Sequence, residues 1–172
     1  FRRVLFRSAA AAWGTGGVVA TVHPLATRAG LDALEAGGNA IDAAVAAALT
    51  LGVVDGHNSG IGGGCFLLIR AADGTLCCID GREVAPGAAT RDMYLREGRP
   101  EEALSRTGAL ACAVPGALAA YRHALERFGR LTLGDALRAG IRHAEEGFPI
   151  DAVFARKLKA AAKDLALFPE SR

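Results

Sequence analysis

Apolar residues recur at helical spacing in the first third of the chain. One helix is predicted to begin at Pro24 and to end before Gly37, because proline favours the first turn of a helix and glycine its end. Asn39 is a predicted N-cap for a second helix, whose interior, residues 43–49, is small and apolar on every side. This second helix is therefore expected to be buried all around.

Two short apolar runs in the middle of the chain predict a β-hairpin. Residues 66–69 and 76–79 flank a turn sequence that contains Asp73 and Gly74. Neither run alternates apolar with polar residues, so the sheet is expected to be covered on both faces. Another short apolar run, residues 18–22, is rich in β-branched residues and predicts a strand that leads into the first helix.

The last third of the chain has a helical pattern. One helix is expected between Pro115 and Gly129, and a capping box formed by Thr132 and Asp135 opens another. Asp151 is the predicted N-cap of a last helix. Together with the hairpin, these helices predict an α/β arrangement in layers.

Composition fits one domain with a sizeable core, since 51% of the 172 residues are hydrophobic. Twenty basic and eighteen acidic residues leave a net charge of +2, which gives no electrostatic preference for nucleic acid or for a membrane surface. No apolar run approaches the roughly 20 residues that span a bilayer. The sequence therefore predicts neither a nucleic-acid partner nor a membrane partner.

The beginning of the chain differs in character from the remainder. Residues 1–16 contain arginines and an alanine run, but their apolar stretch is broken by Arg7 and is too short for the apolar part of a signal peptide. We interpret residues 1–16 as a leader or extraneous segment and residues 17–172 as the domain. The compartment, periplasmic or extracellular or cytoplasmic, stays open.

Neither a metal nor a cofactor is expected. The four cysteines include no Cys-x-x-Cys pair, no histidine stands at zinc-ligand spacing, and free thiols are favoured. The glycine-rich residues 60–64 follow a helix and precede a strand, the reverse of the order in a dinucleotide-binding fold. Ser59 lies near His57 but lacks the Gly-x-Ser-x-Gly spacing of a nucleophile, and His57 and Asn58 are interpreted as loop residues that form hydrogen bonds.

Arg82 is the candidate binding residue. It lies just beyond the second predicted strand, where loops at the ends of sheets often hold ligands. A guanidinium in this place suits bidentate binding of a carboxylate. A salt bridge to Asp80, Glu83 or another acid is the commoner role for such a residue.

Taken together, several motifs resemble one family, the γ-glutamyltransferases. The matching segments are residues 19–26, 37–44, 59–64, 80–86, 89–93, 114–116 and 144–149, so the resemblance covers residues 17–172. Two positions depart from the family pattern: many members have a bulkier residue where Gly81 stands and a glycine where Cys65 stands.

The resemblance implies a fold and a reaction. Members of the family are precursors of the N-terminal nucleophile hydrolase class, with an αββα sandwich, that cut themselves into a large and a small subunit. The N-terminal threonine of the small subunit attacks a γ-glutamyl amide such as glutathione, and the acyl-enzyme passes the group to water or to an acceptor. The chain resembles the N-terminal part of the large subunit, so the resemblance places no catalytic residue in it and implies that the chain alone is inactive.

In the same way the resemblance assigns partners and one site residue. Arg82 would bind the α-carboxylate of a small-molecule γ-glutamyl substrate, without any cofactor, and the small-subunit half of the precursor would complete the fold. Two alternatives stay open. One is a related amidohydrolase or β-lactam acylase with another acyl group; the other is a non-catalytic binding or structural module.

Overall fold

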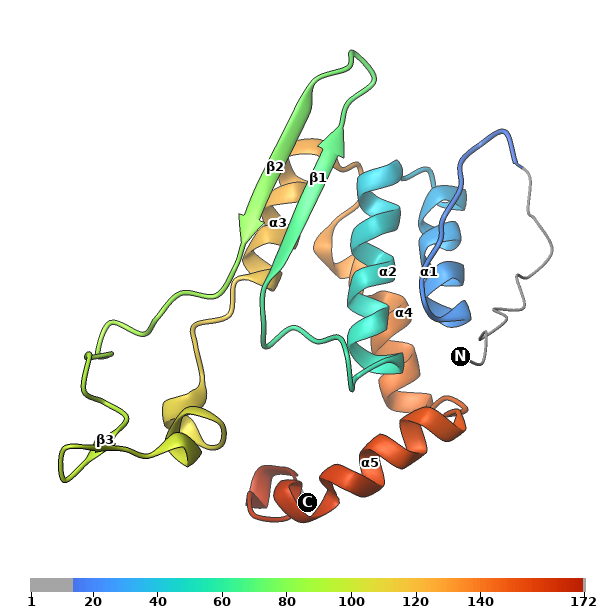
Figure 1. The fold of residues 1–172 in the computed structure, drawn as a ribbon. Helices are drawn as coiled ribbons and strands as arrows, with labels where there is room; N and C mark the ends of the chain where they lie inside the picture. Colours follow the sequence, from blue (N-terminus) through green and yellow to red (C-terminus); the bar gives the residue numbers. More distant parts are fainter. Residues whose placement is uncertain (1–13, 172) are drawn as a thin grey trace, which may run out of the picture.

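The computed structural model describes residues 14–171. The predicted leader or extraneous segment, residues 1–16, lies mostly outside this described part, and its last residues, 14–16, are exposed. Five α-helices and a β-hairpin make up most of the described chain (Figure 1). The helices are α1 (Pro24–Glu35), α2 (Ala40–Val54), α3 (Ala117–Phe128), α4 (Leu133–Glu146) and α5 (Ala152–Leu165). The hairpin strands are β1 (Cys65–Arg70) and β2 (Leu76–Gly81).

Helix α2 is the centre of the helical layer. It packs against α1 on one side and α4 on another, and the core between them is built mainly of small side chains (Figure 1). The predicted cap is confirmed, because the Asn39 side chain accepts hydrogen bonds from the backbone of Ile41 and Asp42. The buried core cluster comprises Ala33, Val45, Ala46, Leu49, Leu125 and Ala136. Small residues at these positions let the helices approach closely.

One side of α2 is open, which corrects the prediction that this helix is buried all around. Ala40 and Ala44 are exposed, and Ala48 and Leu51, which follow on the same side, are only partly buried. Two cavities lie over this side, one toward residues 16–21 and one toward β1. The sequence showed how apolar the helix is, but no described segment covers this side.

The predicted hairpin is confirmed. Strands β1 and β2 pair antiparallel from Cys65 opposite Gly81 to Arg70 opposite Leu76. At the tip, the Asp73 side chain accepts a hydrogen bond of 2.8 Å from the Thr75 backbone, and Gly74 has a φ of 89°, which favours glycine. Local turn chemistry therefore fixes the register of this pair.

The hairpin is covered on one face only, so the predicted two-sided cover is wrong for the described chain. Ile69 is buried, and α3 lies behind this face in Figure 1. On the other face Phe66, Leu68 and Leu76 are 64%, 78% and 66% exposed. Both faces carry apolar side chains, as the sequence indicated, but the described elements supply one layer of helices.

Residues 18–22 do not form the predicted strand. This segment runs extended beside α1, where Val19 lies against the bare backbone of Gly30, while Val18 and Val22 are 75% and 80% exposed. A strand needs a neighbour for its backbone hydrogen bonds. The described part of the chain places no strand beside residues 18–22.

Between the hairpin and α3 the chain makes a long excursion from the main body (Figure 1). It contains a small two-stranded sheet and two short 3₁₀ helices, and a third 3₁₀ helix follows α5. These elements are β3 (Leu95–Arg96), β4 (Arg99–Pro100), η1 (Glu102–Ser105), η2 (Ala109–Ala111) and η3 (Pro169–Ser171). Among residues 14–171, none of the helices has the length and apolar character needed to cross a membrane.

Candidate functional site

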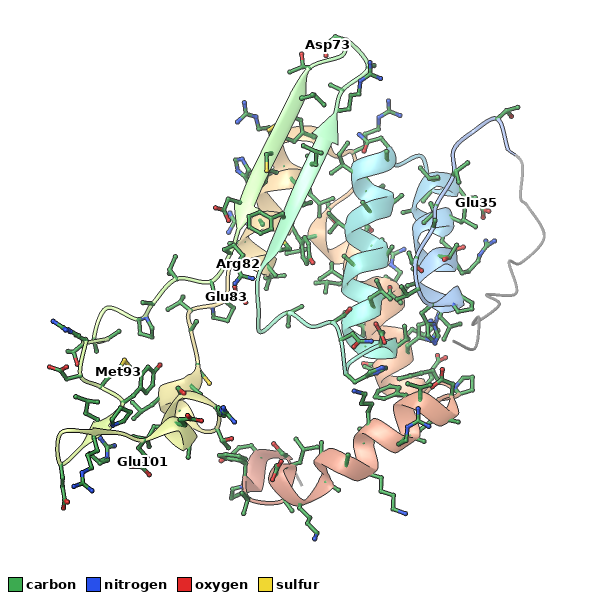
Figure 2. The ribbon with its side chains drawn as sticks, viewed as in Figure 1. Glu35, Asp73, Arg82, Glu83, Met93 and Glu101 are labelled. Carbon is green, nitrogen blue, oxygen red and sulfur yellow. The ribbon has the colours of Figure 1, made fainter. Side chains whose placement is uncertain are left out.

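Arg82 lies at the end of the hairpin, directly after β2 (Figure 2). Its backbone N–H donates a 2.9 Å hydrogen bond to Asp80, and the next residues are tied down by the bridge between Val84 and Val114. The side chain is 62% exposed. The backbone of Arg82 is thus fixed while its guanidinium reaches the surface.

Three glycines surround the backbone at this point. A Cβ atom at Gly64 would lie 2.8 Å from the Arg82 Cα, and one at Gly116 would lie 2.6 Å from the Arg82 carbonyl oxygen. A Cβ at Gly81 would meet the Cβ of Ala120 on α3 at 2.6 Å. All three distances are shorter than side chains tolerate, so glycine is required for the chain segments to meet here.

The structure pairs Arg82 with Glu83. Arg82 Nη1 lies 3.3 Å from Glu83 Oε2, which confirms that a salt bridge to a neighbouring acid is formed. Adjacent residues of a strand point to opposite faces, but the backbone at residues 82–83 is irregular, and this allows the two side chains to meet. Among the described residues, the guanidinium makes no hydrogen bond to a protein acceptor, so its donors remain available to a ligand.

A cavity of about 700 Å³ opens beside this pair. Arg82 and Glu83 are among its lining residues, and much of the remaining lining is apolar and comes from the excursion before α3. The apolar lining includes Val84, Pro86, Met93 and Ala113. A hollow of this size with a few polar groups is typical of small-molecule sites. The arrangement suits a ligand with one carboxylate and a less polar remainder.

Cys65 and Gly81, the two positions expected to depart from the family pattern, are partners across the hairpin. A Cβ at Gly81 would lie 2.6 Å from the Cβ of Ala120 and 3.1 Å from the Cys65 sulfur. Both neighbours take up the space that a side chain at position 81 would need, so the thiol and α3 together require glycine there.

Cys65 is held as a thiol. Burial raises its pKa, and the hydrogen bond with Tyr121 only partly offsets this effect. A nucleophilic cysteine needs a lowered pKa, so Cys65 is unsuited to attack a substrate. Burial, together with the neighbouring Cys65, also raises the pKa of Tyr121 to about 12.

Tyr121 should make the folded state sensitive to alkali. The unfolded chain releases the tyrosine proton near pH 10, whereas the folded protein keeps it to about pH 12. Stability contributed by neutral Tyr121 is thus full below pH 10 and is lost as the pH rises toward 12. The free energy of unfolding can be measured with denaturant from about pH 9 to about pH 11.5, which covers most of this window. It should fall less steeply with pH for Tyr121→Phe than for the wild type. Equal slopes would contradict the burial of this hydroxyl.

A second polar cluster lies at the end of α2. Asp55 is 7% exposed and accepts a 3.1 Å hydrogen bond from Asn58, and His57 Nδ1 lies 3.4 Å from its carboxylate. The His57 ring lies 5.0 Å from the ring of Phe154 on α5. The contact between Asn58 and Asp55 holds the turn at residues 55–58, and the position of His57 in this turn confirms its interpretation as a loop residue. No hydrogen bond between His57 and Ser59 occurs among the described residues.

Sequence reasoning placed Arg82 correctly at the end of a strand but missed how Glu83 is held. The Gly63 carbonyl accepts 3.1 Å hydrogen bonds from the backbone of Gly116 and Ala117 at the start of α3, which fixes the glycine turn against which Glu83 lies. The only sequence signal was a run of glycines whose partner is far away in the chain. Within residues 14–171, no cluster of three or more acidic, histidine or cysteine side chains could hold a metal ion.

Comparison with known proteins gives a consistent result. The sequence model of a family described as gamma-glutamyltranspeptidase matches residues 26–172. The glutathione hydrolase proenzyme of Escherichia coli is 39% identical over 150 residues, which are 87% of this chain and 26% of that protein. The acylase ACY 1 proenzyme of Pseudomonas sp. strain V22 is 44% identical over 167 residues, 92% of this chain and 30% of that protein. The chain therefore spans less than a third of these relatives' length.

The crystal structure of Helicobacter pylori gamma-glutamyltranspeptidase resembles the chain closely. The TM-score is 0.89 at 38% sequence identity, and the match covers 94% of this chain and 46% of that one. The predicted fold class, an α/β chain that forms part of an N-terminal nucleophile hydrolase sandwich, is confirmed by this match. The likeness extends over nearly all of the described elements.

Proposed function

Because the chain belongs to the gamma-glutamyltranspeptidase family, we propose that residues 17–172 are the N-terminal part of the large-subunit region of a γ-glutamyl hydrolase or transferase. The substrates are small γ-glutamyl amides such as glutathione. The nucleophile is a threonine that lies in sequence beyond Arg172, so the chain alone holds no catalytic residue and is inactive. Its own contribution is to bind and orient the substrate.

Arg82 carries this proposal. Its backbone is fixed by Asp80 and by the glycines around it, and its side chain is 62% exposed. Apart from the ion pair of Nη1 with Glu83, its guanidinium donors have no protein acceptor among the described residues. A planar guanidinium with free donors binds a carboxylate through two parallel hydrogen bonds. The α-carboxylate of a γ-glutamyl group meets this requirement, and the adjacent cavity of about 700 Å³ has room for the remainder.

The exposed apolar surfaces of the hairpin and of α2 indicate a partner. Phe66 and Leu68 on the hairpin and Ala44 on α2 are exposed apolar side chains on neighbouring elements. Contiguous apolar surface of this kind marks an interface. We infer that the remainder of the same precursor, the small-subunit half, covers the hairpin face and the open side of α2. Neither a nucleic acid nor a membrane is needed to account for these surfaces.

An acylase of the same superfamily is the second candidate. The identity of 44% to an acylase proenzyme is as high as that to the glutathione hydrolases, so the acyl group is not decided by overall similarity. The two candidates differ in the acyl group that they accept. A γ-glutamyl enzyme should turn over γ-glutamyl anilides in preference to other acyl amides, whereas a β-lactam acylase should prefer another acyl group.

The first test uses protein expressed from the full coding region, extended beyond Arg172. Intact-mass analysis with N-terminal sequencing is expected to show two chains, the smaller beginning with threonine. A separate activity assay is expected to show release of glutamate from glutathione. A single uncut product without activity would contradict the proposal and favour a non-catalytic module. Two chains that cleave acyl amides but not γ-glutamyl amides would support the acylase.

A further inference from the structure

The carboxylate of Glu83 is held unusually for an acid on the protein surface. Its side chain is only 25% exposed, and the Oε2 atom is buried with no hydrogen-bond partner among residues 14–171. Arg82 Nη1 lies 3.3 Å away but not in hydrogen-bond geometry. A buried carboxylate oxygen without a donor is costly, so its position calls for a reason beyond local packing.

The surrounding backbone shows how the carboxylate is kept in place. A Cβ at Gly64 would lie 2.7 Å from Glu83 Oε2, and a Cβ at Gly63 would lie 3.3 Å from Oε1. The carboxylate thus occupies space left by two glycines. The turn that contains them is itself fixed, because the Gly63 carbonyl accepts hydrogen bonds from Gly116 and Ala117. The carboxylate of Glu83 is therefore held in place by its surroundings, whereas the side chain of its partner Arg82 is 62% exposed.

We propose that Glu83 is a positioning residue whose fixed, buried carboxylate orients the guanidinium of Arg82 for binding the substrate carboxylate. Only Nη1 of the guanidinium is paired with Glu83 Oε2, at 3.3 Å, which leaves the remaining N–H groups for the ligand. When a ligand carboxylate binds and reorients the guanidinium of Arg82, Glu83 Oε2 gains the hydrogen bond that it lacks in the free protein. This inference rests on the proposed function of Arg82.

The test compares two substrates of the full-length, processed protein. γ-Glutamyl-p-nitroanilide carries the α-carboxylate, and 4-aminobutyryl-p-nitroanilide lacks only that group. Glu83→Gln keeps the shape of the side chain but removes its charge. We expect it to raise KM for the γ-glutamyl substrate roughly tenfold, by analogy with the loss of residues that orient metal ligands. The kcat and the KM for the aminobutyryl substrate should change little.

A double mutant separates positioning from a general structural effect. If Glu83 acts through Arg82, Glu83→Gln should cost much less in the Arg82→Lys background than in the wild type. Glu126→Gln is the matched control, since it removes the acid of an exposed arginine pair, Arg122 with Glu126 at 2.7 Å, on α3. This control should leave both KM values unchanged.

Should Glu83→Gln fail to fold, Glu83→Asp, which withdraws the carboxylate by one methylene, should show a smaller loss of the same selectivity.

The outcomes separate the two proposals. A wild-type protein that prefers the γ-glutamyl substrate, together with a Glu83→Gln variant of unchanged selectivity, overturns the positioning role alone. Equal KM values for both substrates in the wild type overturn the carboxylate site at Arg82 and the positioning role with it. A lower melting temperature with unchanged KM values shows that Glu83 serves only the glycine turn, which also overturns the inference.

Discussion

Replacement of Arg82 by lysine is expected to raise KM for γ-glutamyl substrates by roughly ten- to a hundredfold with little change in kcat. Lysine keeps the positive charge and the pair with Glu83, but its ammonium cannot form the two parallel hydrogen bonds of a guanidinium. Loss of one charge-assisted hydrogen bond costs about 1.5–3 kcal/mol, which corresponds to this range. Steady-state kinetics of the processed, full-length protein with γ-glutamyl-p-nitroanilide measure it.

The specificity of this effect can be checked within the chain. Arg122→Lys changes another exposed arginine that is paired with a glutamate, at 2.7 Å on α3, and should leave KM unaltered. The aminobutyryl substrate, without an α-carboxylate, should be almost insensitive to Arg82→Lys. Unaltered KM for the γ-glutamyl substrate would remove Arg82 from the binding site and leave the ion pair with Glu83 as its role.

The sequence predicted those parts of the fold that are specified by neighbours in the chain. The hairpin follows from two apolar runs and the turn at Asp73 and Gly74, and the structure has both strands in the expected place. The caps at Asn39, Thr132 and Asp151 are also confirmed. In each of these cases a side chain satisfies a backbone group within three residues, so short-range chemistry is sufficient.

Predictions that depended on distant partners were less successful. The apolar composition of α2 and of the hairpin indicated cover on every side, yet Ala44 and Phe66 are exposed. Residues 18–22 have the composition of a strand but pair with no strand among residues 14–171. Composition records how much apolar surface a segment must bury, but not which segment buries it.

The candidate site shows the same limit at the level of single residues. Sequence position placed Arg82 at the end of a strand, and Glu83 was one of several acids that could pair with it. The actual contact depends on the glycine turn at residues 62–64 and on its hydrogen bonds to α3, more than 50 positions away by residue number. Side-chain orientation at the site is thus a property of tertiary structure.

Asp42 is expected to be the most sensitive polar residue for stability. Its carboxylate is fully buried and accepts hydrogen bonds from the backbone N–H groups of Asn39, Arg130 and Leu131, at 2.7, 3.0 and 3.0 Å. It therefore joins the first turn of α2 to the connection between α3 and α4. Nothing in the local sequence distinguishes this acid from an ordinary capping-box residue.

Substitution Asp42→Ala should destabilise the full-length protein by about 3–5 kcal/mol, because it leaves several buried donors without an acceptor. Asp42→Asn, which keeps one acceptor oxygen, should cost less. Asp135 is the matched control: it occupies the same third position of a capping box, on α4, but its side chain is 35% exposed and it makes no comparable long-range bonds among the described residues. Asp135→Ala should cost about 1 kcal/mol. Denaturant unfolding measures the difference, and similar losses for the two alanine variants would show that the bonds of Asp42 to Arg130 and Leu131 add little to the stability that its capping box provides.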